Sequence, residues 1–214
     1  SRTSHSKALS IKHMQKTISI LGCGWYGLAL AKHLLAKGYN VKGSTTSTDK
    51  LSILHTQGIE SYLVNFTEQS INYDPAFFNS HTLVICIPPK RSSAEQASFP
   101  HKITEICKAA NNNTVKNVLF ISSTSVYGDR NTELSETDEP DPDTPSGKAM
   151  KQAEAILKNQ QAFQTTILRF GGLIGPGRDP GRFFAGKVNS PNGQSPINLI
   201  HLTDCVGIST HIIE

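Results

Sequence analysis

The sequence lacks long hydrophobic runs. No apolar stretch approaches the roughly 20 consecutive residues that a membrane-spanning helix needs, so we expect no transmembrane segment. Cysteines are also few, and the four present lie far apart without a C-x-x-C pair: Cys23, Cys86, Cys107 and Cys205. This spacing argues against a zinc or other metal site and against a thioredoxin-like motif. We therefore expect reduced thiols in a cytoplasmic protein.

Acidic residues are missing from the first sixteen positions, which carry four basic residues: Arg2, Lys7, Lys12 and Lys16. Without them, 17 of the 21 basic residues remain against 17 acidic ones. The rest of the chain is therefore neutral and offers no basic footprint for nucleic acid. We interpret residues 1–14 as an N-terminal tail rather than an export signal, because the stretch has no apolar segment of signal-peptide length. Residues 15–214 suit one domain.

Short β-branched runs alternate with amphipathic stretches along the chain, a pattern typical of the α/β class. Six strands are predicted, at residues 17–21, 40–45, 60–65, 82–87, 117–122 and 165–170. Helices are predicted near residues 26–37, 49–57, 94–110 and 147–159. The expected fold is one doubly wound parallel sheet with helices on both faces. Right-handed crossovers would bring the loops that follow the strands to one carboxyl edge, where such sheets bind ligands.

Glycines spaced as G-x-G-x-x-G follow the first predicted strand and lead into the first helix, at Gly22, Gly24 and Gly27. In this context they predict a dinucleotide site, whereas isolated glycines would indicate only a turn. Gly22 can form the tight turn, Gly24 allows close approach of a pyrophosphate, and Gly27 allows close helix–strand packing. The expected cofactor contacts are Gly22, Gly24, Trp25, Tyr26, Gly27, Ser44, Thr45, Lys50, Ile87 and Pro88.

The second strand does not end in the acidic residue that would bind the ribose 2′-hydroxyl of NAD. It runs instead into "GSTTSTDK", in which Asp49 lies several residues past the expected strand end. Ser44, Thr45, Thr46 and Lys50 could instead bind a 2′-phosphate. We therefore favour NADP over NAD as the cofactor.

The run "LFISSTSVYGD", residues 119–129, resembles the end of the fifth strand in extended short-chain dehydrogenases/reductases, the family of NAD-dependent epimerases and dehydratases. Further matches follow in order: "TPSGKAMKQAEAIL", "ILRFGGLIGPG" and "NLIHLTDCVG". The resemblance extends from Lys16 to the C-terminus. It implies a Rossmann fold, an NAD(P) cofactor and epimerase/dehydratase-like oxidoreductase activity. Since family members usually continue well beyond the last of these segments, the substrate lobe, near residues 175–214, is expected to be small or incomplete.

The resemblance also implies active-site positions, two of which carry unexpected residues. Ser123 stands where the family has a Ser or Thr that holds the substrate hydroxyl or carbonyl. Ser146 occupies the position of the acid/base Tyr, and Met150 that of the Lys four residues later. Serine is a much weaker acid than a phenol, and methionine cannot stabilise an anion. These departures match the atypical short-chain subgroups; Tyr127 is a candidate replacement acid/base, unless it only packs or contacts substrate.

Arginines in two loops indicate a small anionic substrate, because their guanidinium groups suit phosphate or carboxylate oxygens. Arg91 follows the fourth strand, and Arg178 and Arg182 lie where the resemblance places substrate recognition. Solvated surface charge is the alternative for these residues. The sequence leaves open a homo-oligomer, a catalytically silent cofactor-binding redox sensor or regulatory protein, and a reductase of another Rossmann family.

Overall fold

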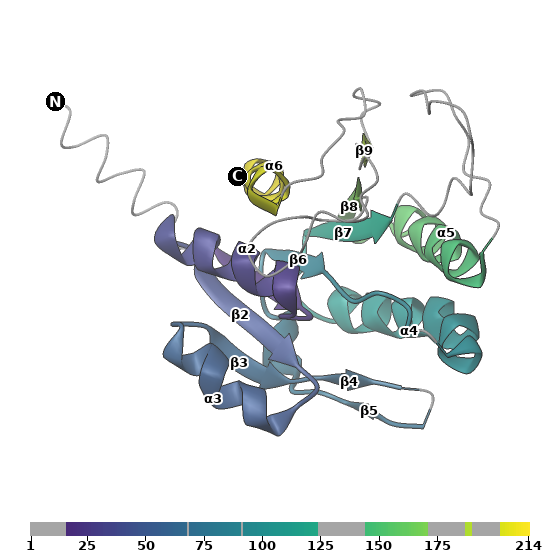
Figure 1. Ribbon diagram of the computed structural model, residues 1–214, viewed down its shortest axis with the longest axis horizontal. Helices are drawn as coiled ribbons and strands as arrows, with labels where there is room; N and C mark the ends of the chain where they lie inside the picture. The colour runs from purple at the N-terminus through teal and green to yellow at the C-terminus, as the bar shows by residue number, and fades with distance from the viewer. Residues whose placement is uncertain (1–15, 68, 91, 124–143, 171–186, 190–201) are drawn as a thin grey trace, which may run out of the picture.

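The computed structural model describes residues 16–67, 69–90, 92–123, 144–170, 187–189 and 202–214 (Figure 1). A seven-stranded sheet forms its centre, in the order β3-β2-β1-β6-β7-β8-β9. Six of these strands are parallel: β1 (Thr17–Leu21), β2 (Asn40–Thr45), β3 (Glu60–Leu63), β6 (Thr82–Ile85), β7 (Asn117–Ser123) and β8 (Gln164–Phe170). The predicted α/β doubly wound sheet is confirmed. The seventh strand, β9 (Lys187–Asn189), pairs antiparallel with β8.

Two predicted strands end earlier than expected, β3 and β6. β3 stops at Leu63, which is in register with Thr45, the last residue of β2. The chain then leaves the sheet and forms a separate antiparallel hairpin, β4 (Asn65–Phe66) with β5 (Ile71–Asn72). β6 stops at Ile85, opposite Leu21 at the end of β1. Both predictions were two residues too long. For the edge strand β3 the reason is that its partner β2 ends at Thr45, whereas β6 ends at Ile85 although its neighbour β7 continues to Ser123.

Helices cover both faces of the sheet (Figure 1). One apolar cluster joins the sheet to α2 (Trp25–Ala36), α3 (Thr48–Thr56) and α6 (Leu202–Ile213). The other joins it to α4 (Ser93–Asn111), α5 (Pro145–Lys158) and the 3-10 helix η1 (Pro75–Phe78). The four predicted helices correspond to α2, α3, α4 and α5. The hairpin, η1, β9 and α6 were not predicted.

Local sequence signals explain where the helices start. The Ser92 hydroxyl accepts a hydrogen bond from the Glu95 amide at the beginning of α4, at 3.3 Å. The Thr144 hydroxyl accepts one from the Gly147 amide at the beginning of α5, at 3.0 Å, and Pro145 occupies its first turn. These are side-chain caps that satisfy otherwise unpaired amides. By contrast, α2 begins after Gly24 with no side-chain cap.

None of the described helices combines the length and apolar character required for crossing a membrane. The tail expected at residues 1–14 lies outside the described residues, as does most of the segment expected to form a substrate lobe.

Buried thiols should make this fold sensitive to alkali. Cys107 in α4 is 2% exposed, and burial raises the pKa of its thiol from an ordinary 9.0 to about 12. The folded chain therefore keeps a proton that the unfolded chain loses above pH 9, so this contribution to stability disappears between pH 9 and 12. We expect Cys107→Ala to reduce the loss of unfolding free energy between pH 8 and 10.5 by about 2 kcal/mol. Urea unfolding at both pH values measures this, and equal losses in the two proteins would contradict it.

Candidate functional site

A cavity of about 290 Å³ opens at the carboxyl edge of the sheet, over the ends of β1, β2, β3 and β6. We call it the carboxyl-edge cavity. Its described lining comprises Leu21, Gly22, Cys23, Gly24, Ser44, Thr45, Thr46, Lys50, Val64, Asn65, Phe66, Thr67, Ile87, Pro88, Lys90 and Lys102. Doubly wound sheets bind ligands at this edge, where the strand order reverses between β1 and β6.

The glycine loop after β1 has different requirements at its three glycines. Gly22 has φ +96°, which an L side chain rarely adopts, and a Cβ at Gly27 would lie 2.2 Å from the Gly22 carbonyl oxygen. The fold itself therefore requires glycine at these two positions. A Cβ at Gly24 would meet nothing within 4 Å. Gly24 lines the cavity and immediately precedes the uncapped N-terminus of α2. The space beside Gly24 is therefore open to a bound group and is not filled by other parts of the protein.

Ser44 connects the glycine loop to the end of β2. Its hydroxyl accepts a hydrogen bond from the Gly22 amide at 2.8 Å, and its carbonyl accepts one from the Cys23 amide at 3.0 Å. The side chain is 2% exposed. Ser44 therefore holds the loop in shape, whereas the more exposed Thr45, Thr46 and Lys50 remain accessible at the cavity rim.

The described lining is cationic. It includes three lysines from three different segments, Lys50, Lys90 and Lys102, and no described lining residue is acidic. Asp49, which could have bound the ribose hydroxyls of NAD, is exposed and is not among the lining residues. An uncapped helix N-terminus adds a partial positive charge to the same cavity. This arrangement favours an anionic ligand.

Cys23 lines the cavity but is poorly suited to nucleophilic chemistry. Burial raises the pKa of its thiol to about 12, although the Ser44 backbone lowers it slightly. The thiol is therefore protonated at neutral pH, and the thiolate is the reactive form. Among the described residues, no group of three or more His, Cys, Asp or Glu side chains could hold a metal ion.

Seven of the ten residues expected at the cofactor line the cavity, and three do not: Trp25, Tyr26 and Gly27. The Tyr26 hydroxyl donates to the Cys205 carbonyl at 3.2 Å and is hydrogen-bonded to the Ser209 hydroxyl in α6. Its ring packs edge-on against Phe170 with centroids 5.3 Å apart. Tyr26 thus joins α2 to α6, an interaction that sequence alone did not reveal because α6 was not predicted.

The family-implied active-site positions lie on β7 and α5. Ser123 is partly buried at the carboxyl end of β7 and is not among the cavity's lining residues. Ser146, Met150 and Glu154 follow one another at four-residue spacing on α5 and therefore share a helix face. Met150 is 4% exposed within the apolar cluster under α4 and α5. The neighbouring Lys148 and Lys151 are exposed, as expected of solvated side chains.

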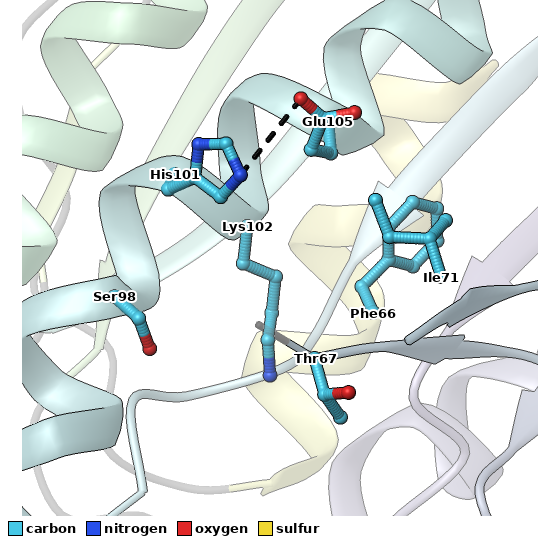
Figure 2. Close-up of a pocket in the computed structure, with 7 residues that line it drawn as sticks. All are labelled: Phe66, Thr67, Ile71, Ser98, His101, Lys102 and Glu105. Atoms are coloured by element: carbon cyan, nitrogen blue, oxygen red, sulfur yellow. Dashed lines mark ion pairs between the residues drawn. The ribbon is translucent and has the colours of Figure 1, made fainter. Parts of the chain in front are cut away.

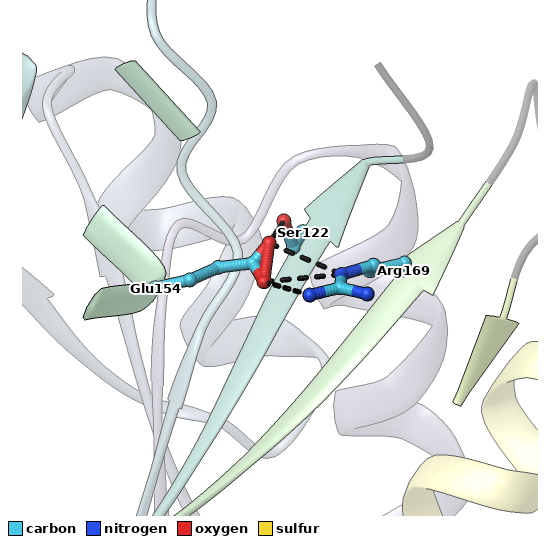
Figure 3. A network of polar contacts seen from close by, with 3 residues as sticks. All are labelled: Ser122, Glu154 and Arg169. Carbon is cyan, nitrogen blue, oxygen red and sulfur yellow. Dashed lines mark hydrogen bonds and ion pairs between the residues drawn. The ribbon is translucent and has the colours of Figure 1, made fainter. Parts of the chain in front are cut away.

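A buried ion pair anchors α5 to the strands behind these positions (Figure 3). The Arg169 side chain of β8 donates to the Glu154 carboxylate from Nε at 3.0 Å and from Nη2 at 2.6 Å. The Ser122 hydroxyl of β7 donates to the same carboxylate at 3.0 Å. Glu154 is 3% and Arg169 4% exposed. The Glu154 carboxylate thus connects α5 to β7 and β8. Its contact on β7 is Ser122, which directly precedes Ser123.

Four expected site residues lie outside the described residues: Tyr127, Arg91, Arg178 and Arg182. Conversely, sequence analysis missed the cavity wall formed by residues 64–67 and Lys102. The wall follows β3, so the rule that loops after parallel strands share one edge could have identified it. Lys102 lies in the middle of α4, where no local sequence signal marks it.

Comparison with known proteins supports this interpretation of the cavity. A family model described as NAD(P)H-binding matches residues 22–204. The chain belongs to this family. The match begins at the glycine loop and continues into α6. Members of the NAD(P)H-binding family are therefore the appropriate reference for the cavity.

A curated relative of this chain is Protein YeeZ of Escherichia coli (strain K12). It is 37% identical over 203 residues, which are 93% of this chain and 73% of YeeZ. A solved structure from Methylobacillus flagellatus, provisionally described as an NAD-dependent epimerase/dehydratase, is 27% identical with a TM-score of 0.62. The match covers 92% of this chain and 70% of that protein.

The fold is shared with sugar-nucleotide epimerases. UDP-glucuronic acid 4-epimerase from Bacillus cereus, solved with UDP-glucuronic acid and NAD, matches with a TM-score of 0.68 at 17% identity. The alignment covers 92% of this chain and 73% of that protein. The chain therefore has the NAD(P)-binding Rossmann fold, and its structural neighbours include epimerases and a protein of the short-chain dehydrogenase/reductase superfamily.

Proposed function

We propose that the chain binds NADP(H) in the carboxyl-edge cavity and acts as an epimerase/dehydratase-like oxidoreductase with a non-standard acid/base. The observation that supports this most is the cavity itself, which combines a glycine loop, an uncapped helix N-terminus and three lysines. Its volume of about 290 Å³ is near the lower end of the roughly 300–1,000 Å³ typical of ligand pockets. This volume suits one of the two nucleotides that make up a dinucleotide.

The end of β2 supports NADP(H) rather than NAD(H). Thr45, Thr46 and Lys50 line the cavity there, whereas the one nearby carboxylate, Asp49, is outside the described lining. A 2′-phosphate would receive hydrogen bonds from the threonines and a charge-assisted contact from the lysine. An unphosphorylated ribose would lack the carboxylate that commonly binds its hydroxyls.

The proposed chemistry needs a different proton donor from the one usual in the family. When bound, the nicotinamide would supply or accept hydride. Ser123 would hydrogen-bond the reacting oxygen of the substrate, and Ser146 stands at the position of the usual acid/base. Met150 cannot lower the pKa of a neighbouring hydroxyl, so serine alone would be a slow proton donor. Tyr127 remains the candidate acid/base.

A catalytically silent NADP(H)-binding sensor or regulatory protein is the second candidate function. It is favoured by Met150, which is buried among apolar side chains where a catalytic ammonium would be needed. Turnover separates the two functions. Oxidation of NADPH across a panel of carbonyl compounds and nucleotide sugars would support the enzyme, whereas tight binding without oxidation would support the sensor.

For the enzyme, we propose a small anionic substrate, such as a nucleotide-linked sugar. The loops of Arg91, Arg178 and Arg182 would recognise its phosphate or carboxylate groups. The support is the cationic cavity together with the UDP-sugar complexes of structural neighbours.

The cofactor choice is testable at two adjacent residues. Lys50→Met should weaken NADPH binding about tenfold and leave NADH binding unchanged, because only NADPH carries the 2′-phosphate. Asp49→Asn is the control, because Asp49 is the residue that would bind the ribose if NAD were preferred. Dissociation constants from fluorescence titration measure both. A wild-type preference for NADH, lost in Asp49→Asn, would overturn the NADP(H) proposal.

A further inference from the structure

Lys102 is a partly buried lysine of α4 that lines both a cavity and a pocket. It lines the carboxyl-edge cavity and also a small pocket between α4 and the β4–β5 hairpin. In Figure 2 its side chain leaves α4 and runs toward Thr67, in the loop that follows β4. The ammonium group thus lies where the hairpin side of the cavity meets the helix.

The ammonium has no hydrogen bond or ion pair among the described residues, although acidic side chains lie nearby. Glu105, one turn further along α4, is engaged by His101 at 3.9 Å and by Lys108 at 3.0 Å. Figure 2 shows the Lys102 side chain directed away from that group. A partly buried charge that no carboxylate contacts directly is unfavourable, and an anionic ligand would relieve this cost.

Lys90 adds a second positive charge beside Lys102. It lies in the loop after β6 and lines the same cavity, and its ammonium is 3.5 Å from the Glu95 carboxylate. Burial lowers the pKa of Lys102, and the charge of Lys90 lowers it further, whereas Glu95 opposes the shift. The two lysines therefore repel each other, and Glu95 is the carboxylate that partly compensates them.

The loop carrying Lys90 passes close to the glycine loop. A Cβ at Gly22 would lie 2.8 Å from Ile87 Cγ2, three residues before Lys90. The pair of Lys90 and Lys102 thus belongs to the α4 side of the cavity, whereas Lys50 belongs to the α3 side. The cavity thus presents cations from both its α3 side and its α4 side.

We propose that Lys90 and Lys102 form a second anion-binding locus, which takes a phosphate oxyanion and is partly blocked by Glu95 until the ligand displaces it. This rests on the proposed function, because it assumes that the cavity accepts a phosphorylated nucleotide. The locus is distinct from the 2′-phosphate position proposed at Thr45, Thr46 and Lys50. The phosphate comes either from the diphosphate of the dinucleotide or from a separate phosphorylated ligand.

Two substitutions should change affinity in opposite directions. Lys102→Met removes an attracting charge and should weaken binding of 5′-ADP about tenfold. Glu95→Gln removes the competing carboxylate and should tighten it about threefold. Binding of 2′-AMP should change less than twofold in both variants. Lys108→Met is the matched control, because it removes an exposed lysine from the same helix outside the cavity. Calorimetric titration measures the affinities, and thermal unfolding verifies that each variant is folded.

A further titration identifies the source of the phosphate. Inorganic phosphate is titrated into the wild-type protein saturated with NADPH. If the cofactor's diphosphate fills the locus, no phosphate binds and Lys102→Met weakens NADH and NADPH by the same factor. If a separate ligand fills it, phosphate binds this complex and Lys102→Met abolishes that binding.

The locus is overturned if Lys102→Met and Lys108→Met both bind 5′-ADP and inorganic phosphate as the wild type does. Failure of the proposed function would be visible independently. If wild-type protein bound neither 5′-ADP nor 2′-AMP, the nucleotide site would be rejected. Titration of the free protein with inorganic phosphate would still test the lysine pair.

Discussion

Replacing Glu154 with glutamine is expected to lower the free energy of unfolding by about 3–5 kcal/mol. The substitution keeps the shape of the side chain but removes a charge that is 3% exposed and holds Arg169 at 2.6 Å. The Arg169 guanidinium, itself 4% exposed, would stay in a nearly dry position without this carboxylate. The Ser122 hydroxyl would also lose its charged acceptor. Equilibrium unfolding in urea measures the loss.

Two further variants make this expectation specific. Glu105→Gln removes a carboxylate from a surface group with His101 and Lys108 and should change stability by less than about 1 kcal/mol. Replacing the buried pair together, as Glu154→Leu with Arg169→Met, should cost less than Glu154→Gln alone, because both buried charges are then removed. A loss below about 1 kcal/mol for Glu154→Gln would show that the ion pair contributes little to stability.

The second large effect is expected within the glycine loop. Gly27→Ala would bring a Cβ within 2.2 Å of the Gly22 carbonyl oxygen, so α2 must move away from the loop. Overpacking of this kind destabilises by about 1–3 kcal/mol. The shift would also disturb the uncapped start of α2 and thereby weaken dinucleotide binding. Thermal unfolding and NADPH titration measure the two effects.

Gly24→Ala is the informative contrast, because a Cβ there meets nothing in the protein. Its folding should change by at most about 1 kcal/mol, the usual loss when alanine occupies an N-cap position. The added methyl would nevertheless occupy the space proposed for the pyrophosphate, and NADPH binding should fall at least about tenfold. If Gly24→Ala bound NADPH as tightly as the wild type, the pyrophosphate would not lie against this residue.

Much of the sheet was predictable from local pattern. The first two strands have the predicted bounds, Thr17–Leu21 and Asn40–Thr45, because β1 is a short β-branched and apolar run that stops at Gly22 and β2 stops where polar residues follow. Errors arose where the limit of an element is set by a neighbour. β3 ends at Leu63 because β2 ends at Thr45, the residue paired with it. Residues 64–65 carry no sequence signal for the end of a strand.

The candidate site likewise contains residues that local sequence predicted and residues that depend on tertiary packing. Gly22, Gly24, Thr45 and Lys50 were predicted at the cavity because they follow strands whose ends meet at one edge. Lys102 was missed because its position depends on how α4 lies against the loop after β3. Tyr26 was expected at the cofactor, but its side chain packs on α6, whose sequence begins 176 residues later in the chain.

The sequence by itself determined the fold class and the glycine loop, since each depends on residue type and local spacing. Only the tertiary structure decided which charges share the cavity and which are neutralised. It placed Lys50, Lys90 and Lys102 around one space and buried Glu154 against Arg169. The physical reason is that electrostatic interactions depend on distance and burial, and these depend on packing between segments far apart in the chain.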